Sequence, residues 1–484
     1  MPRSLSRRQL FAPAAAAKPI LSPCAAPRPV PSAELHVLTR ATFGPTPALL
    51  AQVAAVGIDE WLDTQLDPDR IDDSAFQAAL PGIVQPTSGS GADIRLLAAA
   101  IGSRCQLAWR MVHFLNNHFA TYRAKTQGIS ETQEDDEFRK ECFSTFGNLL
   151  SISARSPAMI DTLDSNSNIA GSPNENYARE LMELHTLGVG GGYTEPDVAQ
   201  VARVFTGWSR VNVVGSGTTV TSSYFRFRSA QHDTGAKSTS LGWATPGLSG
   251  AAGVNEGLSL LAFLAAHPST AARFVTKLCQ YFVADQPPVG LITRVRQVFT
   301  STGGDLRQTV RALFLDVEFA TTATARSKVH DGFELVANAI RRLEFASVNH
   351  ANLNTRVGLL RAQPHQFPVP TGYPEVGPAW QGAGNVLVRW DFADDLVHDR
   401  IGGVVVPWTT LFGSVPPNSG ALWVQQLCNR LVDGEVPATT ILALTVFMDQ
   451  RLLTLPANPT WNQVRPHARA LASLVLRLPE AQLH

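Results

Sequence analysis

The sequence has no excess of either charge, because 40 lysine and arginine residues balance 40 aspartate and glutamate residues. A protein that binds nucleic acid normally carries a basic excess that neutralises phosphates, so this balance argues against a nucleic-acid partner. Cysteine is also scarce, and its five residues are widely scattered: Cys24, Cys105, Cys142, Cys279 and Cys428. This spacing fits neither a zinc ribbon nor a disulfide scaffold.

Long apolar runs are missing too. Nothing after the N-terminus approaches the roughly 18 uninterrupted apolar residues that a membrane-spanning helix requires, so we expect no transmembrane span. The sequence contains no G-x-S-x-G nucleophile turn, no G-x-x-x-x-G-K-[ST] phosphate loop and no H-E-x-x-H zinc motif. The glycine cluster at 188–192 follows a helical pattern instead of opening one, and therefore predicts a helix end, not a dinucleotide-binding loop.

Arg7 and Arg8 precede an alanine-rich stretch, which is the pattern of a twin-arginine export signal. The pattern predicts a periplasmic or extracellular protein that crosses the membrane already folded. The alternative is a disordered basic tail, which would leave the protein in the cytoplasm. We assign residues 1–31 to this signal or tail and residues 32–478 to a single large helical domain, which could divide near 210–255 and 362–390.

The chain has 484 residues, of which 44% are hydrophobic, and most of the apolar spacing is helical. We predict a mainly α fold, a multi-helix globular bundle with one short β element at about 218–228, where aromatic and arginine side chains alternate near the end. The glycine- and proline-rich stretches 210–255 and 362–390 are too long for ordinary connections, which favours a functional role. The predicted helices are 32–40, one that begins at Pro47, 104–124, 134–154, 174–187, 195–207, 254–266, 269–282, 289–301, 305–316, 330–345, 418–431 and 460–476.

A helix over 105–122 would place His118 in an apolar stripe between Phe114 and Tyr122. A histidine in that position either completes the core with a satisfied hydrogen bond or binds a ligand in a dry pocket. His113 would lie on the opposite, polar face of the same helix, where we expect it to be solvated.

The densest group of ionisable residues lies on the helix before the glycine cluster. Glu175 and Arg179, and Arg179 and Glu183, are each four residues apart, which is the spacing of surface ion pairs. Glu180 differs because it falls within the apolar arc, where a carboxylate is costly unless it is paired, protonated or bound to metal. Glu183 lies about 60° from Glu180 around the helix, whereas His185 lies roughly 140° away. His185 therefore either belongs to the core or is redirected where the helix unwinds.

Two loops carry further candidate residues. His232 and Asp233 are adjacent in a polar turn, where they could bind metal, share a proton or simply cap the turn. The segment 371–380 is rich in aromatic and proline residues, including Tyr373 and Trp380. It resembles a substrate platform or lid, although such residues can also serve only to cover a helical core.

These residues favour a metal- or carboxylate-assisted hydrolase that acts on an extracellular or cell-envelope substrate. In a metal-free variant, the two glutamates would act as an acid and base pair. The alternatives are a non-catalytic binding or assembly protein of the cell envelope, whose charged helix is a buried ion-pair network, and a metal-dependent oxidoreductase. The candidate catalytic residues are Glu180, Glu183, His232 and Asp233, and the candidate substrate-binding residues are Asn176, Arg179, Lys237, Tyr373 and Trp380. A divalent transition metal would be bound by His118, Glu180 and His232, which would project inward from different helices and a loop.

Several segments of the sequence occur together in one family. They are Leu38 to Pro45, Asn117-His118-Phe119, Asn174 to Trp208, His232 to Lys237, Ala379-Trp380 and Val388-Arg389-Trp390. With these segments the chain resembles the bacterial family catalogued as domain of unknown function 1800, over about residues 38–471. The resemblance implies a mainly helical, often exported protein, and it implies no established reaction, substrate or cofactor.

Two positions depart from the family pattern, Leu115 in place of an aromatic residue and Asn116 in place of a histidine. The family helix has the order Phe-Trp-His-Asn-His-Phe, whereas this chain has Phe114-Leu115-Asn116-Asn117-His118-Phe119. Asn116 thus replaces one of two histidines. If the paired histidines of the family bind a metal, this chain has lost one potential ligand.

Overall fold

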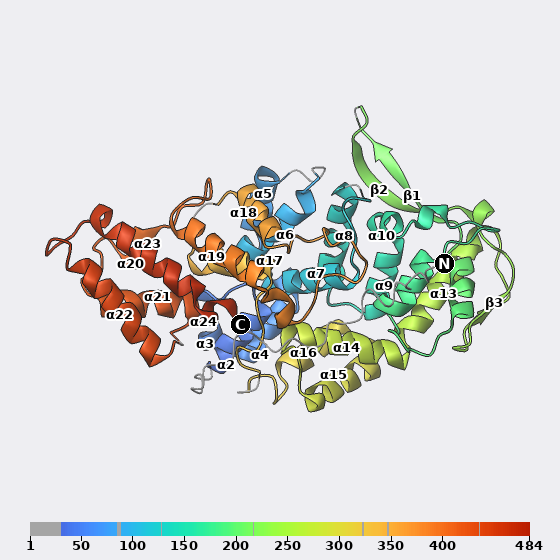
Figure 1. Cartoon of the computed structure of the whole chain (residues 1–484). Helices are drawn as coiled ribbons and strands as arrows, with labels where there is room; N and C mark the ends of the chain where they lie inside the picture. The colour runs from blue at the N-terminus through green and yellow to red at the C-terminus, as the bar shows by residue number, and fades with distance from the viewer. Residues whose placement is uncertain are drawn as a thin grey trace, which may run out of the picture.

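The computed structural model describes residues 31–84, 89–126, 128–215, 217–321, 324–345, 348–434 and 436–484. The fold is mainly α, as predicted, because 60% of it is helical and only 6% forms strands. The helices build an elongated body, with the last helices of the chain at one end and α9 Phe146–Arg155, α10 Pro157–Thr162 and α13 Val254–Ala265 towards the other (Figure 1). Arg7, Arg8 and Cys24, and with them the predicted export signal, lie outside the described residues.

The helices fall into three groups along the chain. The first group is α2 Ala33–Ala41, α3 Pro47–Val56, α4 Ile58–Gln65, α5 Ser74–Ile83, α6 Gly91–Gly102, α7 Gln106–His118, α8 Gly128–Glu141, α9 Phe146–Arg155 and α10 Pro157–Thr162. The second group is α11 Asn176–Glu180, the π-helical turn η3 Leu181–His185, α12 Glu195–Val204, α13 Val254–Ala265, α14 Pro268–Phe282, α15 Val289–Ser301 and α16 Leu306–Phe314. The third group is α17 Gly332–Arg342, α18 His350–Leu359, α19 Ala383–Val397, α20 Trp408–Phe412, α21 Gly420–Val432, α22 Ala438–Leu452, α23 Trp461–Arg477 and α24 Pro479–Gln482.

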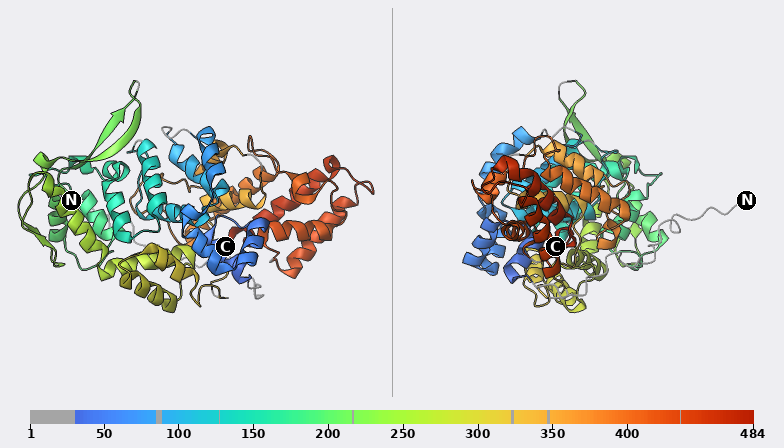
Figure 2. Two further views of the ribbon diagram at one scale, coloured as in Figure 1. Left: turned by 180° about the vertical axis from the view of Figure 1, so that it is seen from behind. Right: turned by 60° about the vertical axis from the view of Figure 1, so that its left-hand side comes forward.

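The strand predicted at about 218–228 is confirmed as β2 Val220–Phe227, which pairs antiparallel with β1 Trp208–Val214. The register shifts at a bulge between Val213 and Val214. This hairpin projects from the helical body in both views of Figure 2. A second, very short ladder joins β3 Lys237–Ser238 to β4 Ala244–Thr245. Strand β1 escaped prediction because several of its valines are exposed and its burial does not alternate.

Two of the predicted helices are divided or shortened. The helix predicted at 134–154 is two helices, α8 and α9, because the side chain of Thr145 accepts a hydrogen bond from the Asn148 amide and starts a new helix. The helix predicted at 104–124 ends at His118, after which the chain turns.

Several helices were not predicted, and α19 begins within the stretch 362–390 that was expected to be a loop; the missed helices are α4, α5, α6, α10, α18, α19, α20, α22 and α24. Helix α6 has the largest number of buried residues among them. All ten residues from Gly91 to Ala100 are buried, so the helix has no polar face to reveal its period.

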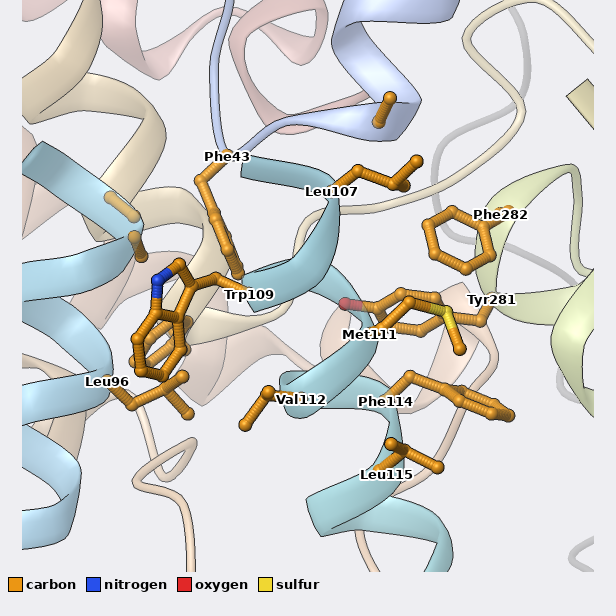
Figure 3. Close-up of a cluster of buried hydrophobic side chains, with 14 of the residues drawn as sticks. Phe43, Leu96, Leu107, Trp109, Met111, Val112, Phe114, Leu115, Tyr281 and Phe282 are labelled. Carbon is orange, nitrogen blue, oxygen red and sulfur yellow. The ribbon is translucent and has the colours of Figure 1, made fainter. Parts of the chain in front are cut away.

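Helix α7 lies at the centre of the core. Eleven of its 13 residues are buried, and its apolar side chains contact those of α6, α14 and the segment after α2. Figure 3 shows this packing around α7. A helix buried on almost every side must place its polar side chains against other polar groups inside the protein or in a cavity. The prediction that His113 is solvated is therefore wrong, since its side chain is only 12% exposed and its ring stacks on Phe333.

Among the described residues, no single helix is long and apolar enough to cross a membrane. One helix pair, Gly250–Ala265 with Pro268–Phe282, reaches the required length and composition jointly but is bent by 66°.

Close packing at Gly257 gives a test of this fold. A Cβ atom at Gly257 would lie 2.4 Å from Cζ2 of Trp208, whereas one at Gly384, also in a helix, would meet nothing within 4 Å. We expect Gly257→Ala to lower the free energy of unfolding by about 1–3 kcal/mol, because the overpacked indole must move. Gly384→Ala should raise it by up to about 1 kcal/mol. Urea denaturation of both variants measures the difference, and equal effects would contradict the contact between α13 and Trp208.

Candidate active site

A polar cavity lies between α7, the start of α17 and the loop at 362–380. Counted as the space open to the centres of water molecules, its volume is about 50 Å³, which is room for a few waters or a small reacting group. Helix α7 and the turn after it contribute His113, Asn116, Asn117 and Thr121. The other polar side chains come from α17 and the loop, and include Asp331, Glu334, His365, Tyr373 and Glu375.

A larger groove of about 450 Å³ borders this cavity on the outside. Cavity and groove share Phe367, Tyr373, Pro374 and Trp380, so these residues form the wall between them. The groove also has amide and guanidinium side chains, from Gln363, Gln366, Asn385 and Arg361. The arrangement is that of a small cavity beside an open groove, and both predicted aromatic residues of the loop line it.

The loop is fastened to α7 by Asn117. Its side-chain oxygen accepts a hydrogen bond from the Tyr373 amide (2.6 Å), and its nitrogen donates to the Tyr373 carbonyl (3.0 Å) and to Glu375 (2.8 Å). Tyr373 and Trp380 use their own polar atoms within the loop, donating to the carbonyls of Gln363 and Pro374. Trp380 is only 8% exposed. The two aromatic side chains are therefore walls of the site and not an open platform.

The α17 end of the cavity contains two carboxylates and an imidazole. Asp331 caps α17 by accepting the Glu334 amide (2.7 Å), and the Glu334 carboxylate accepts the Asp331 amide in return (3.2 Å). Arg110, 1% exposed and stacked over the Tyr281 ring at 4.5 Å, donates to the other oxygen of Glu334. His113 lies beside this group, with Nε2 3.7 Å from Asp331 and Nδ1 2.9 Å from the Tyr281 hydroxyl.

Burial and neighbouring charges separate the pKa values at this end. Burial and the Glu334 carboxylate raise the pKa of Asp331. Burial would raise that of Glu334 as well, but Arg110 and the nearby imidazoles outweigh it and hold the pKa of Glu334 well below its ordinary value. Burial lowers the pKa of His113 to about 4. The pKa values of the two carboxyl groups are thus shifted in opposite directions, that of Asp331 upward and that of Glu334 downward.

The opposite end of the cavity contains a chain of three side chains. The Thr121 hydroxyl lies 3.0 Å from Nδ1 of His365, and Nε2 of His365 lies 3.5 Å from the Asp135 carboxylate on α8. All three are buried. Neither oxygen of Asp135 has a hydrogen-bond partner in the structure, so His365 is its nearest polar neighbour by the contacts described. A hydroxyl, an imidazole and a carboxylate in this order are the parts of an activated nucleophile.

His365 is held in an unusual conformation and environment. Its backbone is left-handed, with φ of 56°, a region that costs energy for a residue with a Cβ. The Arg123 amide donates to its carbonyl at 2.8 Å and fixes the turn. Burial alone would lower the pKa of His365, but the carboxylates of Asp135 and Glu131 outweigh burial and raise it. An imidazole whose pKa is raised in this way is suited to accept a proton near neutral pH.

Asn116 has an unsatisfied side chain in the same cavity. Its amide oxygen and nitrogen are both buried, and neither has a hydrogen-bond partner. A buried carboxamide without partners is costly, so a donor and an acceptor are available to a bound molecule or to water. Asn116 is the residue that stands where the family pattern has a histidine.

The predicted ligand His118 lies elsewhere in the core, among phenylalanines. Its ring contacts those of Phe114, Phe119, Phe146 and Phe274, and its Nε2 atom lies 3.1 Å from the His185 carbonyl. Burial, reinforced by Lys277, lowers the pKa of His118 well below its ordinary value, so the ring is neutral. The surroundings are those of a core histidine with one hydrogen bond satisfied.

The helix with Glu180 and Glu183 widens into the π turn η3, and His185 at its end is buried. The helix thus changes pitch, and His185 belongs to the core, where its ring lies beside those of His118 and Phe119. Arg179 pairs with Glu175, as predicted from their spacing, and with Glu195 instead of Glu183. Asn176 lies at the start of α11, where its side-chain nitrogen is 3.5 Å from Asp164.

The His232 turn is part of a separate buried network. Glu256 accepts a hydrogen bond from Lys237 (2.7 Å) and lies 3.3 Å from Nε2 of His232. Asp233 pairs with Arg203, which lowers the pKa of this carboxyl to about 2. The side chains of Lys237 and Glu256 are both 0% exposed. A solute cannot reach this lysine while the protein is folded, so these contacts support a structural role for it.

The structure does not bring together the three predicted metal ligands His118, Glu180 and His232. Two groups of metal-ligating atoms within 4.8 Å occur in the described part of the chain, His113 with Asp331 and Glu334, and His330 with Glu334 and His484. Both groups centre on Glu334. Sequence reasoning missed it because Asp331 and Glu334 have the spacing of an ordinary capping box, and nothing local relates them to α7, more than 200 residues earlier.

Fold and cavity together define a mainly helical protein with a buried polar centre beside an aromatic groove. The chain belongs to the family described as "Protein of unknown function (DUF1800)", whose model matches residues 36–483. The resemblance found in the sequence is thereby confirmed. No curated protein and no solved structure matches the chain.

The buried pair of Lys237 and Glu256 gives a test of the structural role. We expect Glu256→Gln to lower the free energy of unfolding by about 3–5 kcal/mol, because it removes the nearer counter-charge of a buried ammonium and leaves only Asp233, 3.8 Å away. Adding Lys237→Met to that variant should recover part of the loss. Glu137→Gln removes the exposed partner of Lys140 and should change stability by less than about 1 kcal/mol. A small effect of Glu256→Gln in urea denaturation would argue against a buried pair.

Proposed function

We propose that this protein is a hydrolase and that the reaction takes place in the cavity between α7 and α17. The observation that carries the proposal is the chain of contacts from Thr121 through His365 to Asp135 at one end of that cavity. His365 is the general base, Asp135 orients it, and Thr121 supplies the hydroxyl that it activates. This assignment retains the hydrolase class expected from the sequence but moves the catalytic residues away from Glu180, Glu183, His232 and Asp233.

The chemistry follows from the order of the three groups. Oγ1 of Thr121 attacks the carbonyl carbon of an ester or amide while its proton passes to Nδ1 of His365. That proton then goes to the leaving alcohol or amine as its bond to the carbonyl breaks. Water, deprotonated by His365, attacks the acyl-threonine and releases a carboxylic acid and the free hydroxyl. The Asn116 amide nitrogen is a donor in the same cavity that can stabilise the negative charge on the carbonyl oxygen.

The different sizes of the cavity and the groove support different roles for them in binding a substrate. A cavity of about 50 Å³ admits a small acyl group, whereas the neighbouring groove of about 450 Å³ can hold the larger part of a substrate. The twin-arginine pattern of Arg7 and Arg8 supports an exported enzyme, and hence a substrate in the cell envelope or outside the cell. An acylated surface polymer fits both features.

The first test is covalent labelling. We expect a fluorophosphonate, which reacts with activated hydroxyl groups, to modify the purified protein once, at Thr121, as detected by peptide mass spectrometry. Thr121→Val and His365→Ala should abolish labelling and lower the rate of 4-nitrophenyl acetate hydrolysis by roughly 10³-fold or more. Thr270→Val removes another buried hydroxyl, which lies outside the cavity. This control variant should leave the labelling and the hydrolysis rate unchanged.

Labelling at another residue, or hydrolysis that survives Thr121→Val in a folded protein, would refute the assignment. A protein that takes up no label would favour the binding or assembly function. The hairpin β1–β2 supports that second candidate, since it exposes the side chains of Val211, Val213, Val214 and Tyr224.

The second test is the pH dependence. His365 must be deprotonated to act as a base, and the carboxylates raise its pKa, so kcat/KM should increase with pH through a midpoint above 6.5. Asp135→Asn removes the largest of the raising charges, so the midpoint should move to lower pH while kcat falls. A merely structural role for Asp135 predicts lower stability and an unchanged midpoint. The profile of each variant, measured below its unfolding pH range, separates the two.

A further inference from the structure

We propose that the α17 end of the cavity binds one divalent transition-metal ion, with His113, Asp331 and Glu334 as its protein ligands. This site goes beyond the proposed hydrolase function, because the contacts of Thr121, His365 and Asp135 require no metal. One ligand atom from each of the three residues lies within 4.8 Å of the other two.

The distances suit an ion better than a direct contact. Nε2 of His113 and the nearer oxygen of Asp331 are 3.7 Å apart, too far for a hydrogen bond. Metal–ligand bonds of about 2.0–2.2 Å in a tetrahedral zinc site place neighbouring ligand atoms roughly 3.3–3.5 Å apart. A small inward movement of two side chains therefore brings the observed group to the spacing of a metal site.

Each ligand is held from behind by a second contact. His113 has its other ring nitrogen 2.9 Å from the Tyr281 hydroxyl, and its ring stacks on Phe333 at 4.8 Å. The other oxygen of Asp331 accepts the Glu334 amide, and one oxygen of Glu334 accepts from Arg110. Metal ligands are commonly fixed by outer contacts of this kind, which set the orientation of the ring and the carboxylates before the ion arrives.

The site also faces open space. All three ligands line the cavity, whose water-accessible volume of about 50 Å³ leaves room for water at further coordination positions. Three protein ligands with an open position are the arrangement of a catalytic rather than a structural zinc site.

The second group of candidate ligands, His330, Glu334 and His484, is less suitable. The rings of His330 and His484 are stacked, 4.3 Å apart and within 9° of parallel. The lone pair of an imidazole nitrogen lies in the plane of its ring, so two stacked rings cannot both direct their lone pairs at one ion. Their unpaired nitrogens face Glu334 at 3.8 Å and 3.5 Å as neighbours of its charge.

The types of the three ligands limit which metal ions are expected to bind. One imidazole and two carboxylates, with no thiolate, favour Zn²⁺, Mn²⁺ or Fe²⁺ over the soft Cu⁺ ion. Mg²⁺ prefers oxygen ligands and retains most of its water, so it should bind weakly here.

The test is metal binding by the full chain. After treatment with a chelator, the protein should take up one equivalent of Zn²⁺ in isothermal titration calorimetry, with a rise in melting temperature, and should not respond to Mg²⁺ at the same concentration. Asp331→Asn retains the helix cap but is a poorer ligand, and His113→Phe removes the imidazole. Each should weaken Zn²⁺ binding at least tenfold, as lost ligands do.

Asp305→Asn is the matched control, because Asp305 caps α16 in the same way without a histidine beside it, and it should bind Zn²⁺ like the wild type. Thr121→Val should also bind normally, so that failure of the metal site and failure of the hydrolase proposal are distinguishable. No stoichiometric uptake of Zn²⁺, Mn²⁺ or Fe²⁺, or uptake that Asp331→Asn leaves unchanged, would overturn the proposal. Folding of each variant is checked by circular dichroism before titration.

Discussion

The buried guanidinium of Arg110 is the constraint on which the centre of this molecule depends. A charge on a helix that is buried on almost every side must be paired, and Glu334 provides the partner. That ion pair holds the first turn of α17 against α7. The capping box of α17 then fixes the position of Asp331. His113, on the same face of α7 as Arg110, lies beside Asp331 and Glu334. A well-packed apolar pair could stabilise the fold as well as a buried ion pair does. Stability alone therefore gives no reason for a polar group there, whereas the proposed metal site would use Arg110 to hold Glu334 in place.

The overall fold could be predicted from the sequence to a useful degree, and the site could not. Amphipathic spacing and capping residues found α2, α12 to α16, α21 and α23 with small errors at their ends. Helix α6 was missed because it is buried around its whole circumference, and the division of α8 from α9 depends on one threonine cap. Periodicity describes how a helix meets solvent, which explains the failure at α6 but not at the more exposed helices α5 and α22, which were also missed.

The candidate site could not be predicted from the sequence, for a different reason. Its residues come from α7, α8, α17 and the loop at 362–380, and only the tertiary fold makes them neighbours. The segment around Glu180 was predicted to be the site only because it contains the most ionisable residues. In the structure, Arg179 at its centre holds surface ion pairs with Glu175 and Glu195, and the end of this helix is a π turn. Of the predicted substrate-binding residues, Tyr373 and Trp380 line the cavity, and so does Asn116, the residue that departs from the family pattern.

The structure shows where Asn116, the residue that replaces a family histidine, is located. Asn116 lies in the cavity, between the two groups of side chains, and its amide has no partner. A histidine at this position would add an imidazole to the same space, close to His113 on the same helix face. Members of the family with that histidine and this chain with asparagine should therefore differ in the chemistry of the cavity and not in the packing of the core.

The segment before α17 has a consequence for the order in which the protein forms. Lys328 and His484 exchange backbone hydrogen bonds, and His330 donates to the Gln482 carbonyl, so residues 482–484 form a short ladder with residues 328–330. That ladder lies next to Asp331, the first residue of the cavity on α17. A ribosome that has finished α17 must still add about 140 residues before the ladder can close. The backbone contacts next to Asp331 therefore form only after this segment has been synthesised, although all residues that line the cavity precede it in the chain.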